Sequence, residues 1–274
     1  MMTMMILISK PVFLYDIYIY HMIPYIFIIN LEKRRDRRDH MTKLMSDMRV
    51  TDYEFVEPVI VENYNVTTNE LSLILTVQNI LKEAKKRSLD TCFIFEDDIM
   101  MNNSPDFVIE KIEKVLDNLP QEWDILYFEY CFESCDKIKK INDYLYKVSN
   151  PLCTASIIYN IKSVDKINSC IESQKKNLDS AYLQCHKNDE IQGYMVMPPL
   201  FYQDNKYDTD IQNKAILNLL SVVFEHDNGT KYVCRHDILF KIKWFNAVLL
   251  IIISCTIISV IIISSFKIWT YKAS

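Results

Sequence analysis

The carboxylates in the stretch TCFIFEDDIM, residues 91–100, are the side chains of this sequence best placed to do chemistry. Glu96, Asp97 and Asp98 are consecutive and directly follow a run of apolar residues. Like charges this close repel one another, and each ionised carboxylate resists losing water. Two interpretations stay open: an exposed turn after a buried strand, or a divalent cation that balances the charge. Carboxylate oxygens are ligands that suit Mn²⁺ or Mg²⁺.

A basic segment, KRRDRR at 33–38, is the second feature that could bind a charged ligand. Arginine offers forked hydrogen bonds to phosphate or ribose, and a cation held by the acidic triplet would bridge diphosphate oxygens. Together the two segments supply the parts needed to hold a nucleoside diphosphate. Each alone has an ordinary explanation, because acidic strand ends also occur in phospho-receiver domains and basic runs often begin solvated helices.

Composition removes several classes of protein. The chain has 274 residues but only two glycines, Gly193 and Gly229, which excludes a GxxxxGK[ST] phosphate loop and a GxGxxG dinucleotide fingerprint. The formal net charge of −5 gives no sign of a nucleic-acid-binding surface, so no nucleic-acid partner is expected. A nucleotide, if bound, is therefore expected to be held through a metal ion.

Apolar periodicity predicts alternating strands and helices over residues 24–186. Asn69 or Thr68 is expected to cap the helix over 70–89, and Ser104 with Pro105 to begin another helix whose buried side includes Phe107. The pattern predicts an α/β domain with a mainly parallel sheet flanked by helices. Ligands collect at the carboxyl ends of such strands, where the acidic triplet and the 30–38 loop both fall. The predicted strands are 25–30, 91–95, 123–128 and 152–159, and the later helices are 162–173 and 178–186.

Three segments, in this order and spacing, resemble glycosyltransferase family 25, which includes bacterial lipooligosaccharide galactosyltransferases and procollagen galactosyltransferases. The segments are FIINLEKRRDRRDHM at 27–41, FIFEDDI at 93–99 and PPLFYQDNKYDTDIQ at 198–212. CTASIIYNIKSVDKI at 153–167 and KKNLDSAY at 175–182 are similar to the middle of that family. The resemblance covers about residues 24–212. It implies a GT-A-like fold and a hexosyltransferase that moves galactose or glucose from a UDP-sugar to a hydroxyl of a glycan or protein acceptor.

The resemblance also implies roles for individual residues. Glu96 and Asp98 would hold the cation, Mn²⁺ or Mg²⁺, with Asp97 adjoining them. Asp179 matches an acidic position of the family and is the candidate catalytic base in an inverting reaction. The alternative for Asp179 is an acid at a helix N-terminus that the helix dipole stabilises. The residues expected to border the nucleotide donor or close the site around it are Asn30, Arg34, Arg37, Gln203 and Asp210.

One position departs from the family pattern. The family usually carries a Ser-His pair on the helix before the acidic strand, whereas here Ser72 is followed by Leu73. The missing imidazole implies altered donor contacts or a weakened site. A second hypothesis follows from it, namely a catalytically inactive, membrane-tethered interaction protein that keeps the GT-A fold.

Residues 247–266, AVLLIIISCTIISVIIISSF, contain no charge and are long enough to span a ~30 Å hydrocarbon core as a helix. Aromatic residues, among them Trp244 and Trp269, lie at both ends, as in membrane interfaces. A single-pass membrane protein with a C-terminal anchor is expected; lysines at both ends leave its sidedness open, endomembranes included. The predicted organisation is an N-terminal extension (1–23), the glycosyltransferase-like α/β domain (24–215), a connecting segment (216–243), the transmembrane helix with short flanks (244–269) and a tail (270–274).

The eight cysteines are too scattered for a zinc site and are interpreted as structural thiols, with disulfides left open. His186 and His226 are expected at the surface, because neither has a partner at a metal-ligand spacing. Asp124 and Glu129, on either side of the strand over 123–128, are left without a role.

Overall fold

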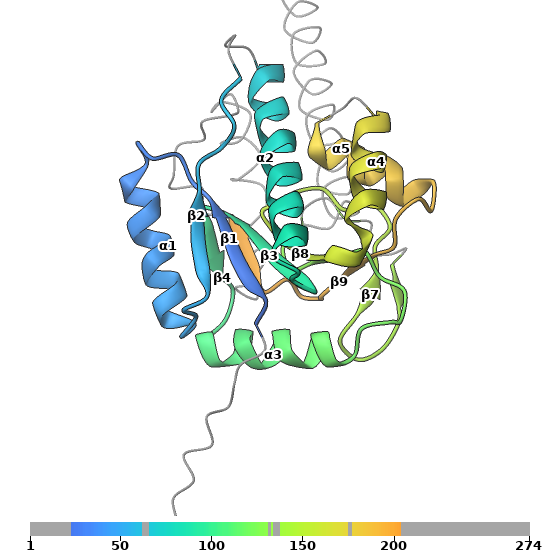
Figure 1. The fold of residues 1–274 in the computed structure, drawn as a ribbon. Helices are drawn as coiled ribbons and strands as arrows, with labels where there is room; N and C mark the ends of the chain where they lie inside the picture. Colours follow the sequence, from blue (N-terminus) through green and yellow to red (C-terminus); the bar gives the residue numbers. More distant parts are fainter. Residues whose placement is uncertain (1–22, 62–65, 131–132, 134–137, 175–176, 204–274) are drawn as a thin grey trace, which may run out of the picture.

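The computed structural model describes the predicted α/β domain up to Gln203, which lies within the last family-like segment, 198–212 (Figure 1). Asp210, His226 and the predicted transmembrane helix at 247–266 lie outside the described residues. Within the described part of the chain, no helix is both long and apolar enough to cross a bilayer. The described residues are 23–61, 66–130, 133, 138–174 and 177–203.

The described residues form one eight-stranded sheet, in the order β2-β1-β3-β8-β5-β9-β7-β6, and a two-stranded sheet of β4 and β10. The helices are α1 Arg35–Asp47, α2 Val66–Lys86, α3 Pro105–Asp117, the 3₁₀-helix η1 Ile161–Ser163, α4 Val164–Gln174 and α5 Leu178–Lys187. The strands are β1 Tyr25–Ile29, β2 Tyr53–Val56, β3 Thr91–Glu96, β4 Ile99–Met101, β5 Ile125–Tyr127, β6 Lys139–Lys140, β7 Tyr146–Lys147, β8 Ser156–Asn160, β9 Gly193–Met195 and β10 Phe201–Gln203.

Most strands of the large sheet point the same way, which confirms the prediction of a mainly parallel α/β sheet. β2, β1 and β3 are mutually parallel, and β5 is parallel to β9. β8 is inserted between β3 and β5 and is antiparallel to both. This reversed strand has a consequence for the site, because its first residue lies at the edge where β3 and β5 end.

Helices cover both faces of the sheet, so the domain has three layers (Figure 1). α2, α4 and α5 pack on one face, in a cluster that contains Phe27, Ile94 and Ile157 from the strands. α1 and α3 pack on the other face with Ile28, Phe93 and related residues. The alternation of neighbouring strand residues between the two clusters is the pattern of a sheet buried on both sides.

The central strand β3 explains why TCFIF is continuously apolar. Cys92 and Ile94 face the α2 side, Phe93 and Phe95 face the α1 side, and all four are at most 2% exposed. Two expectations about helices were wrong. Phe107 is 46% exposed and does not belong to the buried side of α3. α2 already includes Val66, so Thr68 and Asn69 lie inside the helix and do not cap it.

The two-stranded sheet joins the acidic segment to a distant part of the chain. β4 follows directly on the turn made by Asp97 and Asp98, and it pairs antiparallel with β10, Gln203 lying opposite Ile99. Asn102 adds two hydrogen bonds to this junction, from its backbone N–H to Leu200 and from its side chain to Pro199. The acidic turn is therefore fixed on one side by residues about a hundred positions away.

Candidate active site

The parallel register of β1 and β3 brings the first two predicted site residues together. Ile29 lies opposite Glu96, so the next residue of each strand, Asn30 and Asp97, meet at the carboxyl edge of the sheet. The side-chain amide of Asn30 donates a hydrogen bond of 2.7 Å to Oδ2 of Asp97. Both residues are buried. The sequence prediction that these two strand ends meet is confirmed.

Arg37, in the first turn of α1, points into the acidic turn. Its guanidinium donates to Oδ1 of Asp97 at 2.6 Å and lies 3.5 Å from Oδ2 of Asp98. The Arg37 and Asp97 side chains are each 8% exposed, so this is a buried ion pair with little screening by water. Both oxygens of Asp97 are thus engaged by protein groups, Asn30 on one and Arg37 on the other.

The carboxylates of Asp98 and Glu96 differ from that of Asp97, because they accept fewer or longer hydrogen bonds from protein donors. Gln203 donates to Oδ1 of Asp98 at 3.3 Å. Burial raises the pKa of Asp98 even though the charge of Arg37 opposes the shift. Burial, with the nearby negative charges of Asp98, Asp179 and Glu129, raises the pKa of Glu96 well above its ordinary value. We call Asn30, Arg37 and the Glu96–Asp98 triplet the β3 side of the site.

Glu129 is a site residue to which the sequence reasoning gave no role. It follows β5 and is 5% exposed, and its Oε2 is buried with no hydrogen-bond partner among the described residues. Burial and the charges of Asp179 and Asp98 raise its pKa well above the ordinary value, against a hydrogen bond from the backbone N–H of Ala155. Its sequence signal is the same as that of the triplet, an acid directly after a buried apolar strand.

Asp179 lies in the first turn of α5, and its carboxylate bonds to residues outside that helix. It accepts hydrogen bonds from the backbone N–H of Cys153 at 3.2 Å and from Oγ1 of Thr154 at 3.0 Å. Burial raises the pKa of Asp179, although these two hydrogen bonds oppose the shift. The structure brings this carboxylate into the same acidic cluster as Glu96 and Glu129.

The tripeptide Cys153–Ala155, immediately before β8, connects these acids. Cys153 and Thr154 donate hydrogen bonds to Asp179. The backbone N–H of Ala155 donates to Glu129. The carbonyl of Ala155 accepts a hydrogen bond of 2.9 Å from the backbone N–H of Glu96. Cys153 has φ of +66°, a left-handed backbone conformation that is uncommon for residues other than glycine. We call Glu129, Cys153–Ala155 and Asp179 the β8 side of the site.

Of the remaining predicted residues, Asp210 lies outside the described residues, and the backbone carbonyl of Arg34 accepts a hydrogen bond of 3.3 Å from the side chain of Asn30 on the β3 side. Arg34 forms an ion pair of 3.0 Å with Asp36 near the surface. Leu73, in the position of the family's histidine, packs against the core cluster on the α2 face. The basic segment also borders an open hollow of about 550 Å³, none of whose lining residues belongs to the triplet. The lining residues are Glu32, Arg35, Arg38 and Asp39.

The donor atoms of the cluster are of the type that suits a hard divalent cation, although no three of these carboxylates have oxygens within 4.8 Å of one another among the described residues. They are oxygens only, and those of Glu96 and Asp98 are held near other carboxylates, which disfavours the ionised forms unless positive charge is supplied. The buried Oε2 of Glu129 is a further acceptor without a donor among the described residues. Glu96 and Asp98 therefore fit the role of metal ligands better than Asp97, whose oxygens are occupied.

Curated relatives share part of this sequence. Procollagen galactosyltransferase 1-A of Xenopus laevis is 25% identical over 125 residues, which cover 37% of this chain and 20% of that protein. Human procollagen galactosyltransferase 2 is 25% identical over 128 residues, with the same coverage of 37% and 20%. The chain thus matches about a fifth of the length of these relatives. No family model matches the sequence, and membership of glycosyltransferase family 25 is not established by these similarities.

Solved structures with a similar arrangement are distant. A197 from STIV has a TM-score of 0.38 at 13% identity, covering 70% of this chain and 99% of that one. A glycosyltransferase involved in glycosylation of the major capsid of PBCV-1 has a TM-score of 0.35 at 13% identity, covering 64% and 93%. UDP-glucose pyrophosphorylase complexed with UDP-glucose has a TM-score of 0.37 at 7% identity, covering 62% and 72%. TM-scores this low support no conclusion about the function of this chain.

Proposed function

We propose that this chain is a metal-dependent glycosyltransferase that transfers a hexose, galactose or glucose, from a UDP-sugar to a hydroxyl of a glycan or protein acceptor. The observation that carries the proposal is that the Cys153–Ala155 tripeptide bonds to Asp179, to Glu129 and to the backbone of Glu96, which gathers these acids at the carboxyl ends of β3 and β5. Ligands of mostly parallel α/β sheets bind at that edge. The partial identity to procollagen galactosyltransferases supports the same reaction class.

Glu96 and Asp98 would hold Mn²⁺ or Mg²⁺, which when bound neutralises charge that develops on a diphosphate leaving group. Arg37 holds Asp97 in place through a hydrogen bond of 2.6 Å, so the turn carrying the two ligands keeps one shape. Gln203 restrains Asp98 from the other side. Asn30 completes the hydrogen bonds of the turn, and Arg34 and Asp210 are proposed to contact the nucleotide.

Asp179 is the proposed base that accepts the proton of the acceptor hydroxyl. Burial favours its protonated form, so the carboxylate has a higher proton affinity than an exposed aspartate. Cys153 and Thr154 fix the direction of its oxygens. A base held by neutral donors is able to take up a proton without breaking a strong ion pair, which suits this role.

The proposal is tested by ligand-induced stabilisation of the full chain in detergent or membranes. UDP with Mn²⁺ should raise the melting temperature, since a ligand that binds only the folded state stabilises it by about 2.7 kcal/mol at one hundred times its Kd. For a domain of this size that is a rise of roughly 5–10 °C. UDP with EDTA should give almost none of it. Absence of any shift with UDP and Mn²⁺ would contradict the enzyme proposal.

A second candidate, a catalytically inactive and membrane-tethered interaction protein with this fold, is favoured by two observations. Leu73 takes the place of the family's histidine, and it is partly buried against the core cluster on the α2 face. Arg37 already neutralises part of the acidic turn without a metal ion. This candidate predicts a folded domain whose melting temperature does not respond to UDP, to Mn²⁺ or to both.

Attachment to a membrane is a further part of the proposal. Residues 247–266 would form a single-pass C-terminal anchor, because twenty uncharged positions match the thickness of the hydrocarbon core. Retention of the chain in carbonate-washed membranes, and its release when residues 247–274 are deleted, tests this part. Release of the intact chain by carbonate would contradict it.

A further inference from the structure

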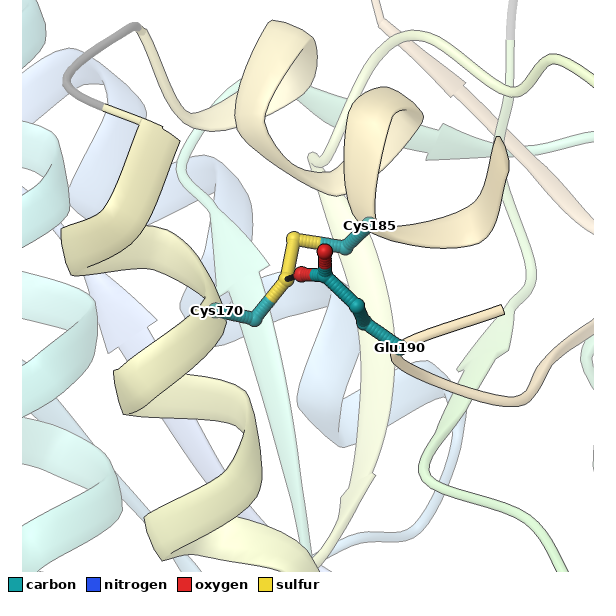
Figure 2. Close-up of side chains that lie close together, drawn as sticks. All are labelled: Cys170, Cys185 and Glu190. Atoms are coloured by element: carbon teal, nitrogen blue, oxygen red, sulfur yellow. Dashed lines mark hydrogen bonds between the residues drawn. A yellow bond between two sulfur atoms is a disulfide. The ribbon is translucent and has the colours of Figure 1, made fainter. Parts of the chain in front are cut away.

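A disulfide joins two helices beside the candidate site. Cys170 in α4 and Cys185 in α5 are bonded, and their Cα atoms lie 6.2 Å apart (Figure 2). Both side chains are buried, and Oε2 of Glu190 lies 3.0 Å from Sγ of Cys170. The residues enclosed by this link include Asp179, which lies in the first turn of α5. The position of the candidate base therefore depends on a segment closed by a covalent bond.

A third disulfide-bonded cysteine, Cys153, contacts the carboxylate of Asp179 through its backbone. By contrast Cys92, in β3 on the other side of the site, is a buried free thiol, and burial raises its pKa. The contact between Cys153 and Asp179 thus joins a disulfide-bonded residue to α5, a helix that the Cys170–Cys185 disulfide links to α4.

We infer that the Cys170–Cys185 disulfide positions Asp179, and that the domain matures in an oxidising compartment. Asp179 receives two neutral hydrogen bonds and no ion pair among its described contacts, so nothing as strong as the Arg37–Asp97 pair fixes it. A covalent link between α4 and α5 limits how far the first turn of α5 can shift. Small displacements of a catalytic group cost large factors in rate, about 10²-fold for roughly 1 Å.

The compartment follows from the chemistry of cysteine. Disulfides persist in the secretory pathway and outside the cell, whereas cytosolic thiols are kept reduced. A buried, oxidised pair in the domain thus indicates the lumenal or extracellular side of the proposed membrane anchor. The sequence left this sidedness open, since lysines lie at both ends of residues 247–266.

Peptide mapping tests the linkage without any assay of activity. Cells expressing the full chain are treated with a thiol-alkylating reagent before lysis, and the protein is digested with trypsin without reduction. Cleavage after lysines 166, 175, 176 and 187 separates the peptides 167–175 and 177–187. These should appear joined, and they should separate after reduction. Recovery of both peptides alkylated before reduction would overturn the inference, whether the thiols were free or held a metal ion together with Glu190.

Kinetics test the positioning role, which rests on the proposed function. In the double variant Cys170→Ser/Cys185→Ser, kcat for transfer should fall about 10²-fold. The donor KM and the stabilisation by UDP with Mn²⁺ should stay near the wild-type values, because the β3 side contains no described disulfide. Circular dichroism at the assay temperature establishes that the variant is folded. A folded variant with wild-type kcat would overturn the positioning role.

If the double variant does not fold, mild reduction of the wild-type chain replaces it. Loss of transfer with retained binding of UDP and Mn²⁺ would support the positioning role where peptide mapping shows Cys170 and Cys185 reduced and Cys153 still oxidised, and unchanged transfer after complete reduction of the pair would overturn it. A wild-type chain that shows the linked peptides but neither binds UDP with Mn²⁺ nor transfers a sugar would refute the proposed function and the positioning role, while the linkage and the compartment would stand.

Discussion

The two sides of the candidate site are built differently, although both present carboxylates at one edge of the same sheet. On the β3 side a buried arginine, Arg37, neutralises Asp97 directly. On the β8 side no lysine or arginine bonds to Glu129 or Asp179 among the described residues, and the donors are neutral groups of the Cys153–Ala155 tripeptide. Charge on the β3 side is thus partly balanced by the protein itself. Burial raises the pKa of Glu96 and Asp98 on the β3 side as it does for Glu129 and Asp179 on the β8 side, so the two sides differ in the donors that face their carboxylates and not in the direction of the pKa shift.

The largest expected effect concerns a predicted metal ligand. Asp98→Ala should lower Mn²⁺-dependent transfer or UDP-sugar hydrolysis by more than about 10³-fold, because a metal ion supplies several kcal/mol of transition-state stabilisation. Asp106→Ala is a matched control, since Asp106 is an exposed acid of α3 whose described partner is Arg49. Initial rates over a Mn²⁺ titration measure the effect. Retention of more than a tenth of the activity would remove Asp98 from the metal site.

Asp179 tests whether the β8 side acts separately from donor binding. Asp179→Asn keeps the size of the side chain but not its basicity, so kcat should fall about 10²–10⁴-fold, the usual contribution of a general base. Stabilisation by UDP with Mn²⁺ should be unchanged. If this variant keeps the wild-type kcat, Asp179 is not the base. Its role is then the alternative one, an acid in the first turn of α5 that stabilises the start of the helix.

The buried ion pair of the β3 side should matter to stability more than to chemistry. Arg37→Met leaves Asp97 buried and unpaired, and the free energy of unfolding should fall by about 3–5 kcal/mol. In Arg37→Met/Asp97→Leu much of this loss should return, because replacing both partners removes the uncompensated charge. Urea unfolding of both variants measures the difference. Equal stability of the single variant and the wild type would mean that solvent, not Arg37, neutralises Asp97.

A smaller effect lies in the core beneath the β8 side. His186 was expected at the surface, but it is buried, and its Nε2 lies 3.0 Å from the hydroxyl of Tyr127. Burial lowers its pKa from 6.5 to about 4. The neutral imidazole therefore favours folding above pH 6.5, and this stability is lost as the pH falls toward 4, because only the unfolded state takes up the proton.

The loss through His186 should be on the order of 2 kcal/mol between pH 7 and pH 4.5. Urea unfolding at the two pH values, for the wild type and for His186→Gln, isolates this contribution because the other titrating groups are common to both proteins. The variant should be less stable at pH 7 but should lose less stability on acidification. The same loss in both proteins would mean that His186 takes up a proton in the folded state.

Comparison of the two sides also shows what the sequence could predict. The β3 side is formed by the ends of two strongly apolar strands, β1 and β3. These strands are parallel neighbours, and their ends meet in register. Asn30, Arg37 and the triplet could therefore be grouped from sequence. The orientation of β8 could not, since SIIY is apolar whichever way the strand runs. Its reversal brings Cys153–Ala155, and not Asn160, to the ends of β3 and β5, and so completes the β8 side.

Other differences have similar local causes. β2 was not predicted, because YEFV is a short and only partly buried edge strand without strict alternation. The pairing of Cys170 with Cys185 depends on how α4 and α5 pack, which spacing alone does not fix. Glu129 carried the expected signal of an acid after a buried strand, but its significance emerges only beside Asp179. Leu73 was recognised as a departure from the family pattern, and in the structure it is partly buried against the core cluster on the α2 face.

The pairing of β4 with β10 sets a minimum length for any working piece of this protein. A chain that ends before Phe201 would leave Ile99–Met101 without a strand partner and Asp98 without Gln203. During synthesis the acidic turn would likewise stay incomplete until the ribosome has passed these codons. Shortened versions intended for crystallisation should therefore end no earlier than Gln203.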